Sequence, residues 1–256
     1  MNAEAMNNQE GTIIVNKYVK STRNSPMDYH YRGLKVHALY GLHEHIATLA
    51  TKFFEKGSNL LDLGAGSGAM SLRLADLGFR VTAVDILEES FALRGIIPFK
   101  RLDLNTSFSK EFNIKFDGIL AIEIIEHLEN PRKFLRECVK LLNPNGNIII
   151  TTPNIDNPVS KALFVRQGSF MWFNDFNYKW EGHISPMSQW EIQKIVEENK
   201  LEVRAIHSFG DPYKDVKKRW IKLYFLAKLI EKIENYKKSS DLMGEILVLI
   251  LRLTLS

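Results

Sequence analysis

Cysteine is nearly absent from this sequence, since Cys138 is the only one among 256 residues. A chain with one cysteine forms no internal disulfide and no zinc site with several cysteine ligands, and it is typical of a reducing cytoplasm. Cys138 falls among the apolar positions of a predicted helix, which favours a buried thiol over a nucleophile.

Hydrophobic runs of membrane-spanning length are lacking as well. The longest apolar tract, residues 242–255, is interrupted by Glu245 and Arg252 and is shorter than the roughly 20 residues that a transmembrane helix needs. Residues 1–27 are polar and do not have the basic and then apolar order of a signal peptide, so we expect a flexible N-terminal segment. We therefore predict a cytoplasmic protein with one domain over residues 28–256.

A strong overall charge is absent too, because the formal net charge is only +4 at pH 7. The positive charge is local: residues 214–238 hold nine Lys and Arg against three Asp and Glu, which leaves the rest of the chain slightly acidic. The apolar residues of this segment have the spacing of one helix face: Val216, Trp220, Leu223, Tyr224, Ala227 and Ile230. Such a basic amphipathic helix can lie on an anionic membrane, pack on its own domain or pair with a second copy of the chain.

What the sequence does contain is a regular alternation of short aliphatic runs with helical segments. The aliphatic runs are predicted strands: Asn59–Leu63, Arg80–Asp85, Phe99–Asp103, Phe116–Ile122, Asn147–Thr152, Leu201–Phe209 and Gly244–Leu253. Apolar residues at helical spacing predict helices at Lys35–Phe54, Ala69–Leu77, Pro131–Leu142 and Ser188–Asn199. This alternation is typical of an α/β protein with a parallel sheet built from βαβ units.

A glycine-rich turn follows the first of these strands, in the sequence LLDLGAGSG. Gly64, Gly66 and Gly68 alternate directly before a predicted helix, where glycine lets the backbone turn tightly and approach a ligand closely. Alone this loop is a weak signal, because nicotinamide and flavin proteins use related turns; its spacing is GxGxG and not GxGxxG.

Carboxylates stand at the ends of three consecutive predicted strands. Asp62 precedes the glycine turn, Asp85 ends the next strand and Asp103 ends the third. A carboxylate in the position of Asp85 can accept both hydroxyls of a ribose, and Asp103, which is flanked by leucines, can accept an adenine amino group. Ligands of open parallel sheets bind at this carboxyl edge, so the three strand ends together predict a nucleoside-containing ligand.

These segments resemble the motifs of class I S-adenosylmethionine-dependent methyltransferases. LLDLGAGSG is similar to their first motif, VTAVDI to the second and RLDLN to the segment that contacts adenine. The resemblance implies a Rossmann-like, seven-stranded, mostly parallel sheet with helices on both faces, an N-terminal helical leader and a cofactor-binding core over residues 58–154. It also implies that S-adenosylmethionine is bound by Asp62, Gly64, Ala65, Gly66, Gly68, Asp85, Ile86, Asp103, Leu104 and Ile122.

The fourth predicted strand runs into Glu123, Glu126 and His127, in the spacing ExxEH. If this turn is helical, two carboxylates and an imidazole converge, which suits proton transfer or a divalent metal. FDGILAIEIIEHLENP closely resembles the corresponding region of ubiquinone-biosynthesis O-methyltransferases, and small-RNA 2′-O-methyltransferases use ExxEH with a later histidine to hold a divalent metal. The candidate for that histidine is His183, so Glu123, Glu126, His127 and His183 are predicted ligands of Mg²⁺ or Mn²⁺.

The same residues have other readings. Glu126, His127 and His183 are also candidate catalytic residues, with a histidine as general base. Alternatively, Glu126 and His127 orient the following helix while His183 holds the nearby loop by a hydrogen bond. That loop, residues 155–187, is aromatic and irregular in sequence, and we expect either a lid over the substrate or a cover for the edge of the sheet.

Three functions remain open from the sequence. The favoured one is O-methylation of a small molecule such as a phenol, a quinone precursor or a sugar. An alternative is metal-assisted 2′-O-methylation of a nucleic acid, which the slightly acidic core disfavours because phosphate contacts need Lys and Arg. The third is a non-catalytic cofactor-binding module, which the intact set of Asp85, Asp103 and ExxEH disfavours.

Overall fold

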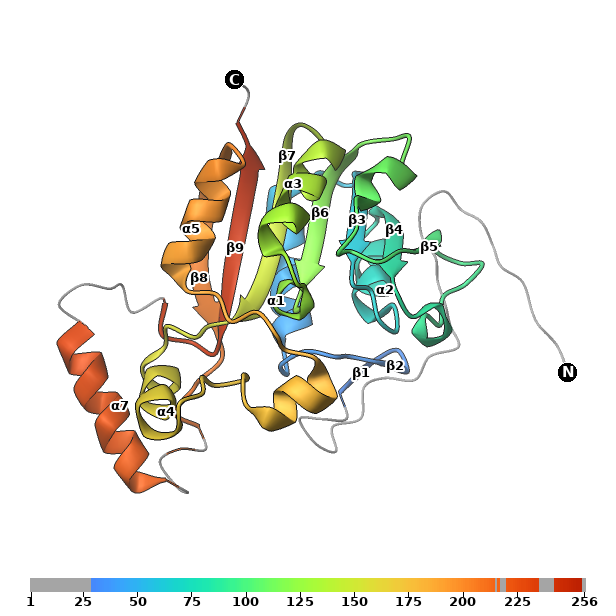
Figure 1. Ribbon diagram of the computed structural model, residues 1–256. Helices are drawn as coiled ribbons and strands as arrows, with labels where there is room; N and C mark the ends of the chain where they lie inside the picture. The colour runs from blue at the N-terminus through green and yellow to red at the C-terminus, as the bar shows by residue number, and fades with distance from the viewer. Residues whose placement is uncertain (1–28, 215, 217–219, 235–241, 255–256) are drawn as a thin grey trace, which may run out of the picture. The chain divides into compact units, whose positions relative to one another are not determined.

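The architecture is built on a seven-stranded sheet with the strand order β5-β4-β3-β6-β7-β9-β8. The computed structural model describes residues 29–214, 216, 220–234 and 242–254 (Figure 1). The strands are β3 (Asn59–Leu63), β4 (Arg80–Asp85), β5 (Phe99–Arg101), β6 (Phe116–Ile122), β7 (Leu142–Pro153), β8 (Leu201–Phe209) and β9 (Ile246–Leu253). β3, β4 and β5 pair in parallel, whereas β8 and β9 pair antiparallel. The predicted fold class is therefore confirmed.

The chain divides into two compact units. One contains Met1–Leu120 and Lys140–Asn147, and the other contains Ala121–Val139 and Ile148–Ser256. The predicted flexible segment, residues 1–27, lies outside the described residues, and the division of residues 28–256 into functional segments remains a prediction.

The first unit owes its core to strands that are almost continuously apolar. Leu60, Leu61 and Leu63 of β3 are fully buried, as is Val84 of β4, because strands of a parallel sheet are covered on both faces. The register pairs Leu63, the last residue of β3, with Val84, so β4 extends one residue further, to Asp85. Two helices of this unit are α1 (Leu42–Phe53) and α2 (Ala69–Asp76), and α2 begins directly after the glycine turn.

The first helix begins later than the sequence predicted. Instead of a helix from Lys35, the chain forms the antiparallel hairpin of β1 (His30–Tyr31) and β2 (Leu34–Lys35). The two turn residues of this hairpin, Arg32 and Gly33, both have positive φ, which matches the right-handed twist of the paired strands. Gly41 then precedes α1 with φ 85°, so the apolar spacing that suggested a longer helix crosses a turn.

The second unit contains a helix where the sequence suggested an irregular loop. Residues 155–187 include α4 (Pro158–Gln167) and a short π-helical turn (Asn177–Glu181). The Asn157 side chain accepts a hydrogen bond from the Ser160 N–H at 2.8 Å, and Pro158 occupies the first turn. This N-terminal signature of a helix was in the sequence, but the crowded aromatic residues around it obscured the pattern.

The basic amphipathic helix is confirmed in its central part as α7 (Ile221–Glu234). Of the predicted span 214–238, residues 215, 217–219 and 235–238 lie outside the described part of the chain. α7 lies beside α4 (Figure 1), and a small core joins the two helices through Val159, Ala162, Leu223 and Ala227. Two further helices, α3 (Pro131–Leu141) and α5 (Gln189–Glu198), agree closely with prediction. No helix among the described residues has both the length and the apolar character needed to cross a bilayer.

Candidate functional site

The glycine turn in the first unit is a preformed loop. The N–H groups of Gly64 and Ala65 both donate to the carbonyl oxygen of Val84 at 2.9 Å, which ties the turn to the end of β4. Gly68 has φ 90°, and a Cβ atom there would come within 2.9 Å of the buried side chains of Phe91 and Leu93. Only glycine therefore fits at Gly68 without moving the core.

Asp85 is held by the backbone around it. Its Oδ2 accepts a hydrogen bond from the Gly66 N–H at 2.8 Å, and its Oδ1 accepts one from the Leu87 N–H at 2.9 Å. Each carboxylate oxygen keeps further lone pairs, which hydroxyl groups of a ligand can use. Ile86 and Leu87 are 51% and 53% exposed, so an apolar surface is available directly after β4.

Asp62 is part of the interior. Its Oδ2 accepts a hydrogen bond from the Ser71 hydroxyl at 2.5 Å, which joins the end of β3 to α2. Burial raises the pKa of Asp62 to about 6, and the nearby negative charge of Asp85 adds to the increase. Asp62 therefore stabilises the strand and helix on either side of the glycine turn, and it is also a candidate ligand contact.

Of the other predicted cofactor residues, Ala65, Asp103 and Leu104 belong to the first unit, and Ile122 belongs to the second. Asp103 follows β5, and its Oδ1 accepts a hydrogen bond from the Asn105 N–H at 2.8 Å. Ala65, Leu104 and Ile122 are buried, so their role in ligand contact would be limited to small exposed portions of each residue.

The leader before α1 contributes a residue that the sequence did not single out. A Cβ atom on Gly66 would lie 3.9 Å from Cδ2 of His37, and the Ser67 hydroxyl donates to the Lys35 carbonyl at 2.6 Å. The leader therefore lies against the glycine turn. Burial lowers the pKa of His37, as does the neighbouring Lys35, whereas Asp85 raises it. A histidine in a short polar leader carries no sequence signal of this position.

In the second unit, the fold brings together three of the four predicted metal ligands, two from the ExxEH segment and His183 from a later loop. Glu126, His127 and His183 each offer a ligand atom, and these atoms lie within 4.8 Å of one another. Only Ile125–His127 forms a helical turn, a 3-10 turn, and Glu123 before it has φ 51°. The Glu123 carboxylate instead accepts a hydrogen bond from the Thr151 hydroxyl at 2.8 Å.

Glu126 is the most unusual side chain of this cluster. It is 0% exposed, and neither carboxylate oxygen accepts a hydrogen bond from any residue that the structure describes. Burial raises its pKa well above the usual value for a glutamate, and the nearby charge of Glu123 raises it further, whereas the neighbouring Thr152 hydroxyl acts in the opposite direction. Burial likewise raises the pKa of Glu123 to about 7. A carboxylate in this state favours a proton or a cation as its partner.

His183 is oriented by a residue with unusual backbone geometry. Its Nδ1 lies 2.7 Å from the carbonyl oxygen of Trp172, and Trp172 has φ 67°. Because a carbonyl only accepts, the proton of the neutral imidazole is on Nδ1 and the lone pair is on Nε2. The backbone carbonyl of Glu126 accepts hydrogen bonds from the N–H groups of Ile184 and Ser185, which fixes this segment to the ExxEH turn.

A surface concavity of about 670 Å³ adjoins this cluster in the second unit. Its lining comes from the segment between β7 and α5 and includes one member of the cluster, His183: Gln167, Gly168, Ser169, Phe173, Asn174, Asp175, Tyr178, His183, Ile184 and Pro186. A concavity of this size accommodates a small molecule.

The comparison with known proteins agrees with these features. The sequence profile of a family described as a methyltransferase domain matches residues 34–206. The chain belongs to this family of S-adenosylmethionine-dependent methyltransferases. The methyltransferase also resembles a solved S-adenosylmethionine-dependent methyltransferase from Archaeoglobus fulgidus, with a TM-score of 0.56 and 19% identity over 82% of this chain and 94% of that one. At this identity the likeness shows the fold alone.

Two curated relatives carry the same name. The ubiquinone biosynthesis O-methyltransferase of Caulobacter sp. (strain K31) is 30% identical over 173 residues, which cover 64% of the methyltransferase and 67% of the relative. That of Rickettsia conorii is 27% identical over 190 residues, covering 65% and 60%. The methyltransferase thus spans about two thirds of the length of these relatives, and the resemblance expected from the sequence is confirmed.

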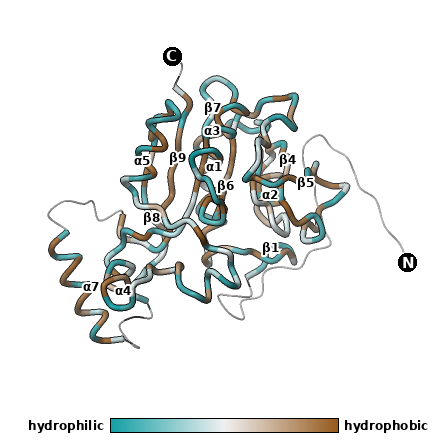
Figure 2. The backbone as a smooth tube through the Cα atoms, viewed as in Figure 1, coloured by the Kyte–Doolittle hydropathy of each residue, from teal (hydrophilic) through white to brown (hydrophobic). Residues whose placement is uncertain are grey.

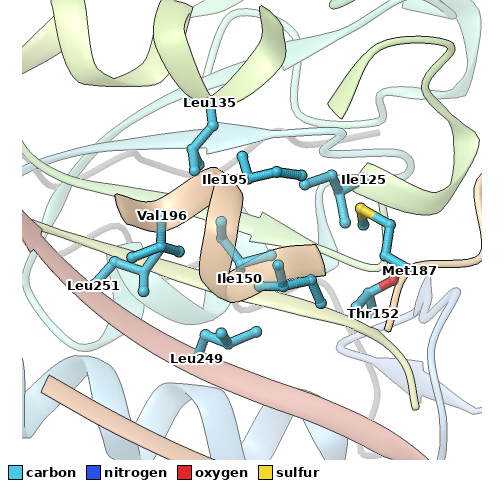
Figure 3. Close-up of a pocket in the computed structure, with 10 residues that line it drawn as sticks. Ile125, Leu135, Ile150, Thr152, Met187, Ile195, Val196, Leu249 and Leu251 are labelled. Carbon is cyan, nitrogen blue, oxygen red and sulfur yellow. The ribbon is translucent and has the colours of Figure 1, made fainter. Parts of the chain in front are cut away.

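A second cavity, inside the second unit of the methyltransferase, does not qualify as a substrate site. It measures about 10 Å³, room for about one water molecule. Figure 3 shows its apolar lining, in which the hydroxyl of Thr152 is the polar group among Ile125, Leu135, Ile150, Met187, Ile195, Val196, Leu249 and Leu251. Ile192 also lines this cavity.

Cys138 is fully buried, and burial raises its thiol pKa well above the usual value, so it is unsuited to act as a nucleophile.

Proposed function

We propose that this methyltransferase methylates a hydroxyl oxygen of a small molecule and that Glu126, His127 and His183 hold a divalent cation. The observation that carries the cation is the Glu126 carboxylate, which is buried without a hydrogen bond from the described residues. An unpaired buried charge is costly, and a cation shared with two imidazoles would offset that cost. Imidazole and carboxylate ligands suit Mn²⁺, and carboxylates suit Mg²⁺.

The cofactor is proposed to bind the glycine turn of the first unit. Asp85 is assigned to the ribose hydroxyls, because both of its oxygens are fixed by backbone N–H groups and retain lone pairs. Ile86 and Leu87 offer an apolar surface suited to a base, and Asp103 is assigned to its amino group. Asp62, Gly64, Ala65, Gly66, Gly68, Leu104 and Ile122 complete the proposed contacts. S-adenosylmethionine supplies the electrophilic methyl group of its sulfonium.

The residues of the chain then have to orient the acceptor and manage one proton. The acceptor oxygen takes the methyl group, the electron pair of the broken S–CH₃ bond stays on sulfur, and the hydroxyl proton leaves. If a cation is bound, His183 Nε2 would be one of its ligands, and the ion would supply Lewis-acid chemistry to the acceptor hydroxyl. Without one, the same Nε2 lone pair takes up the proton directly as a general base. The dependence of activity on Mn²⁺ separates the two roles.

Calorimetric titration tests the proposal. S-adenosylhomocysteine is expected to bind, and NAD is expected not to. Mn²⁺ is expected to bind the wild type, and Glu126→Gln should weaken that binding by about tenfold or more while leaving S-adenosylhomocysteine affinity unchanged. The control is Glu137→Gln, which changes another buried glutamate of the second unit and should retain both affinities. Equal Mn²⁺ binding by wild type and Glu126→Gln would remove the metal site, and no binding of S-adenosylhomocysteine would remove the whole proposal.

The names of the relatives support a small-molecule acceptor, since they are O-methyltransferases of ubiquinone biosynthesis. The alternative acceptor, a nucleic acid, needs cations for its phosphates. The concavity beside His183 has no Lys or Arg among the described residues of its lining, which favours the small molecule.

We further propose that the outer face of α7 contacts an anionic membrane surface. Ile221, Phe225, Leu229 and Ile233 follow one another at four-residue spacing, and each is more than half exposed. Figure 2 shows hydrophobic and hydrophilic segments alternating along this helix. Apolar residues of this kind, mixed with lysines, insert at the boundary between headgroups and acyl chains.

The charges of α7 favour lipid over a second copy of the chain. Lys222 and Lys232 stand next to the exposed apolar residues in the helix, whereas Glu231 binds Lys228 and Glu234 binds Lys161. A symmetric dimer through this face would bring lysines against lysines, while anionic headgroups neutralise them. The predicted cytoplasmic location remains a prediction.

Vesicle sedimentation at low salt tests the membrane contact. Vesicles with a third of anionic lipid should pull down the wild type, and the double variant Phe225→Glu, Leu229→Glu should remain in the supernatant. The control Ile114→Glu changes an exposed apolar residue of the first unit and should sediment like the wild type. Failure of the wild type to sediment, or a dimer that the double variant dissociates, would overturn the membrane role.

A further inference from the structure

The concavity that contains His183 has a polar lining, unlike a pocket for an apolar substrate such as a prenylated phenol. Hydrogen-bonding side chains from Gln167, Ser169 and Asn174 line much of it, together with Asp175. A prenyl tail has no polar groups, so it would leave these side chains without partners when it displaces water. The lining therefore suits an acceptor that is itself rich in hydroxyl groups.

The lining groups can donate as well as accept. The Gln167 amide donates to the Ser169 hydroxyl at 3.0 Å, which leaves that hydroxyl able to donate onward. Asn174 Oδ1 accepts the N–H groups of Phe176 and Asn177, so its Nδ2 amide remains as a donor. Amides and hydroxyls in this arrangement match hydroxyl groups, which both donate and accept.

Two aromatic rings stand among these polar groups. Tyr178 is 66% exposed, and the ring of Phe173 lies 5.6 Å from that of His183. An aromatic ring offers an apolar face that a saturated ring can cover with its C–H groups while its hydroxyls reach the polar side chains. This combination of ring faces and amides fits a polyhydroxylated ring.

The charge of the lining disfavours acceptors that carry a phosphate or a carboxylate. Among its described residues there is no Lys or Arg, so a phosphate or carboxylate finds no cation. Asp175 is exposed and forms no ion pair with any described residue, so an acidic acceptor would also meet repulsion. An acceptor without negative charge remains.

We propose that the acceptor is a neutral, polyhydroxylated ring such as a glycosyl unit, bound in the concavity of residues 167–186 with one hydroxyl at His183. The inference rests on the proposed O-methyltransferase function and names its substrate class. Methyl transfer to that hydroxyl forms an O–CH₃ bond, breaks the S–CH₃ bond of the cofactor and leaves its electron pair on sulfur. The hydroxyl proton goes to the Nε2 lone pair of His183, or to water if a cation occupies that nitrogen.

The test is a panel of acceptors with S-adenosylhomocysteine release as the readout, in the presence of Mn²⁺. The probes are the methyl glycosides of common hexoses and deoxyhexoses, catechol, a prenylated dihydroxybenzene and a dihydroxybenzoate. Release is expected with at least one glycoside, and it should exceed release with the prenylated phenol and the carboxylated ring. Mass spectrometry should find the glycoside heavier by about 14 mass units, which is the difference between CH₃ and H.

One variant connects the activity to the concavity. Tyr178→Ala should raise the glycoside KM by about tenfold, as expected for loss of one aromatic contact. The control Trp190→Ala removes an equally exposed ring that does not line the concavity, and it should behave as wild type.

The outcomes separate this inference from the proposed function. Turnover of the prenylated phenol or of catechol alone, with no glycoside methylated, would overturn the glycosyl assignment and leave O-methylation intact. A glycoside whose KM is unchanged by Tyr178→Ala would overturn the binding site. Absence of S-adenosylhomocysteine binding by calorimetry would overturn the proposed function itself.

Discussion

Carboxylates in the two units of the protein have opposite surroundings. In the first unit Asp85 accepts two backbone N–H groups, and Asp62 accepts the hydroxyl of Ser71. In the second unit Glu126 is fully buried, yet its carboxylate accepts no hydrogen bond from any described residue. Hydrogen-bonded carboxylates keep their geometry without a ligand, whereas an unpaired one needs a proton or a cation. The glycine turn is thus preformed, whereas the ExxEH cluster contains a carboxylate without a hydrogen-bond partner among the described residues.

The largest expected effect comes from breaking the preformed turn. Gly68→Val should lower the free energy of unfolding by ~4 kcal/mol, because Gly68 has positive φ and its Cβ would contact Phe91 and Leu93. Gly95 also has positive φ, but a Cβ there meets no atom within 4 Å among the described residues. Gly95→Ala should therefore cost only about 1 kcal/mol. Urea denaturation checks both, and equal losses would mean that packing around Gly68 is unimportant.

A second prediction concerns Asp62 and pH. Burial raises its pKa to about 6 from 3.8, so the native state binds the proton more tightly than the unfolded chain. The resulting stabilisation is present below about pH 4 and is lost as pH rises through about 6, a change of roughly 3 kcal/mol. Asp62→Asn keeps an acceptor for Ser71 and should lack this part of the pH dependence. Unfolding curves between pH 4 and 7 test it, and parallel profiles for the two proteins would contradict it.

The third prediction reverses the usual effect of a core substitution. Without divalent ions, Glu126→Met should raise the free energy of unfolding by about 1–3 kcal/mol, because it removes a buried polar group that has no partner. In Mn²⁺ the wild type should gain stability and the variant should not. Thermal melts with and without Mn²⁺ measure both effects. A variant less stable than wild type in the absence of metal would indicate that Glu126 is satisfied in solution.

The smallest expected effect tests whether ligand binding at Asp85 and at Glu126 is independent. Asp85→Asn should weaken S-adenosylhomocysteine binding by about tenfold, because it loses charge-assisted hydrogen bonds. It should leave Mn²⁺ affinity unchanged, while Glu126→Met should show the reverse pattern. Calorimetry of both ligands with both variants gives four values. Loss of both affinities in either variant would show that the two regions do not act independently.

Most strands and their ends were predictable, because burial on both faces leaves a continuous aliphatic signal. β3, β4, β6 and β8 have the predicted boundaries. The leader was predicted wrongly as a helix from Lys35, since Arg32, Gly33 and Gly41 adopt positive φ that apolar spacing does not report. α4 was missed for the opposite reason: its capping residues were present, but aromatic crowding suggested a loop.

The sequence by itself determined the α/β class, the glycine turn and the carboxylates at the strand ends, because these follow from local periodicity and from residue types at fixed spacing. Tertiary structure decided which polar groups have partners. Thr151 takes Glu123 out of the cluster, and the carbonyl of Trp172 selects the nitrogen that His183 presents. Such pairings join residues that are 28 and 11 positions apart, and they depend on where the folded chain brings them. Burial without a partner, as at Glu126, exists only in the folded state.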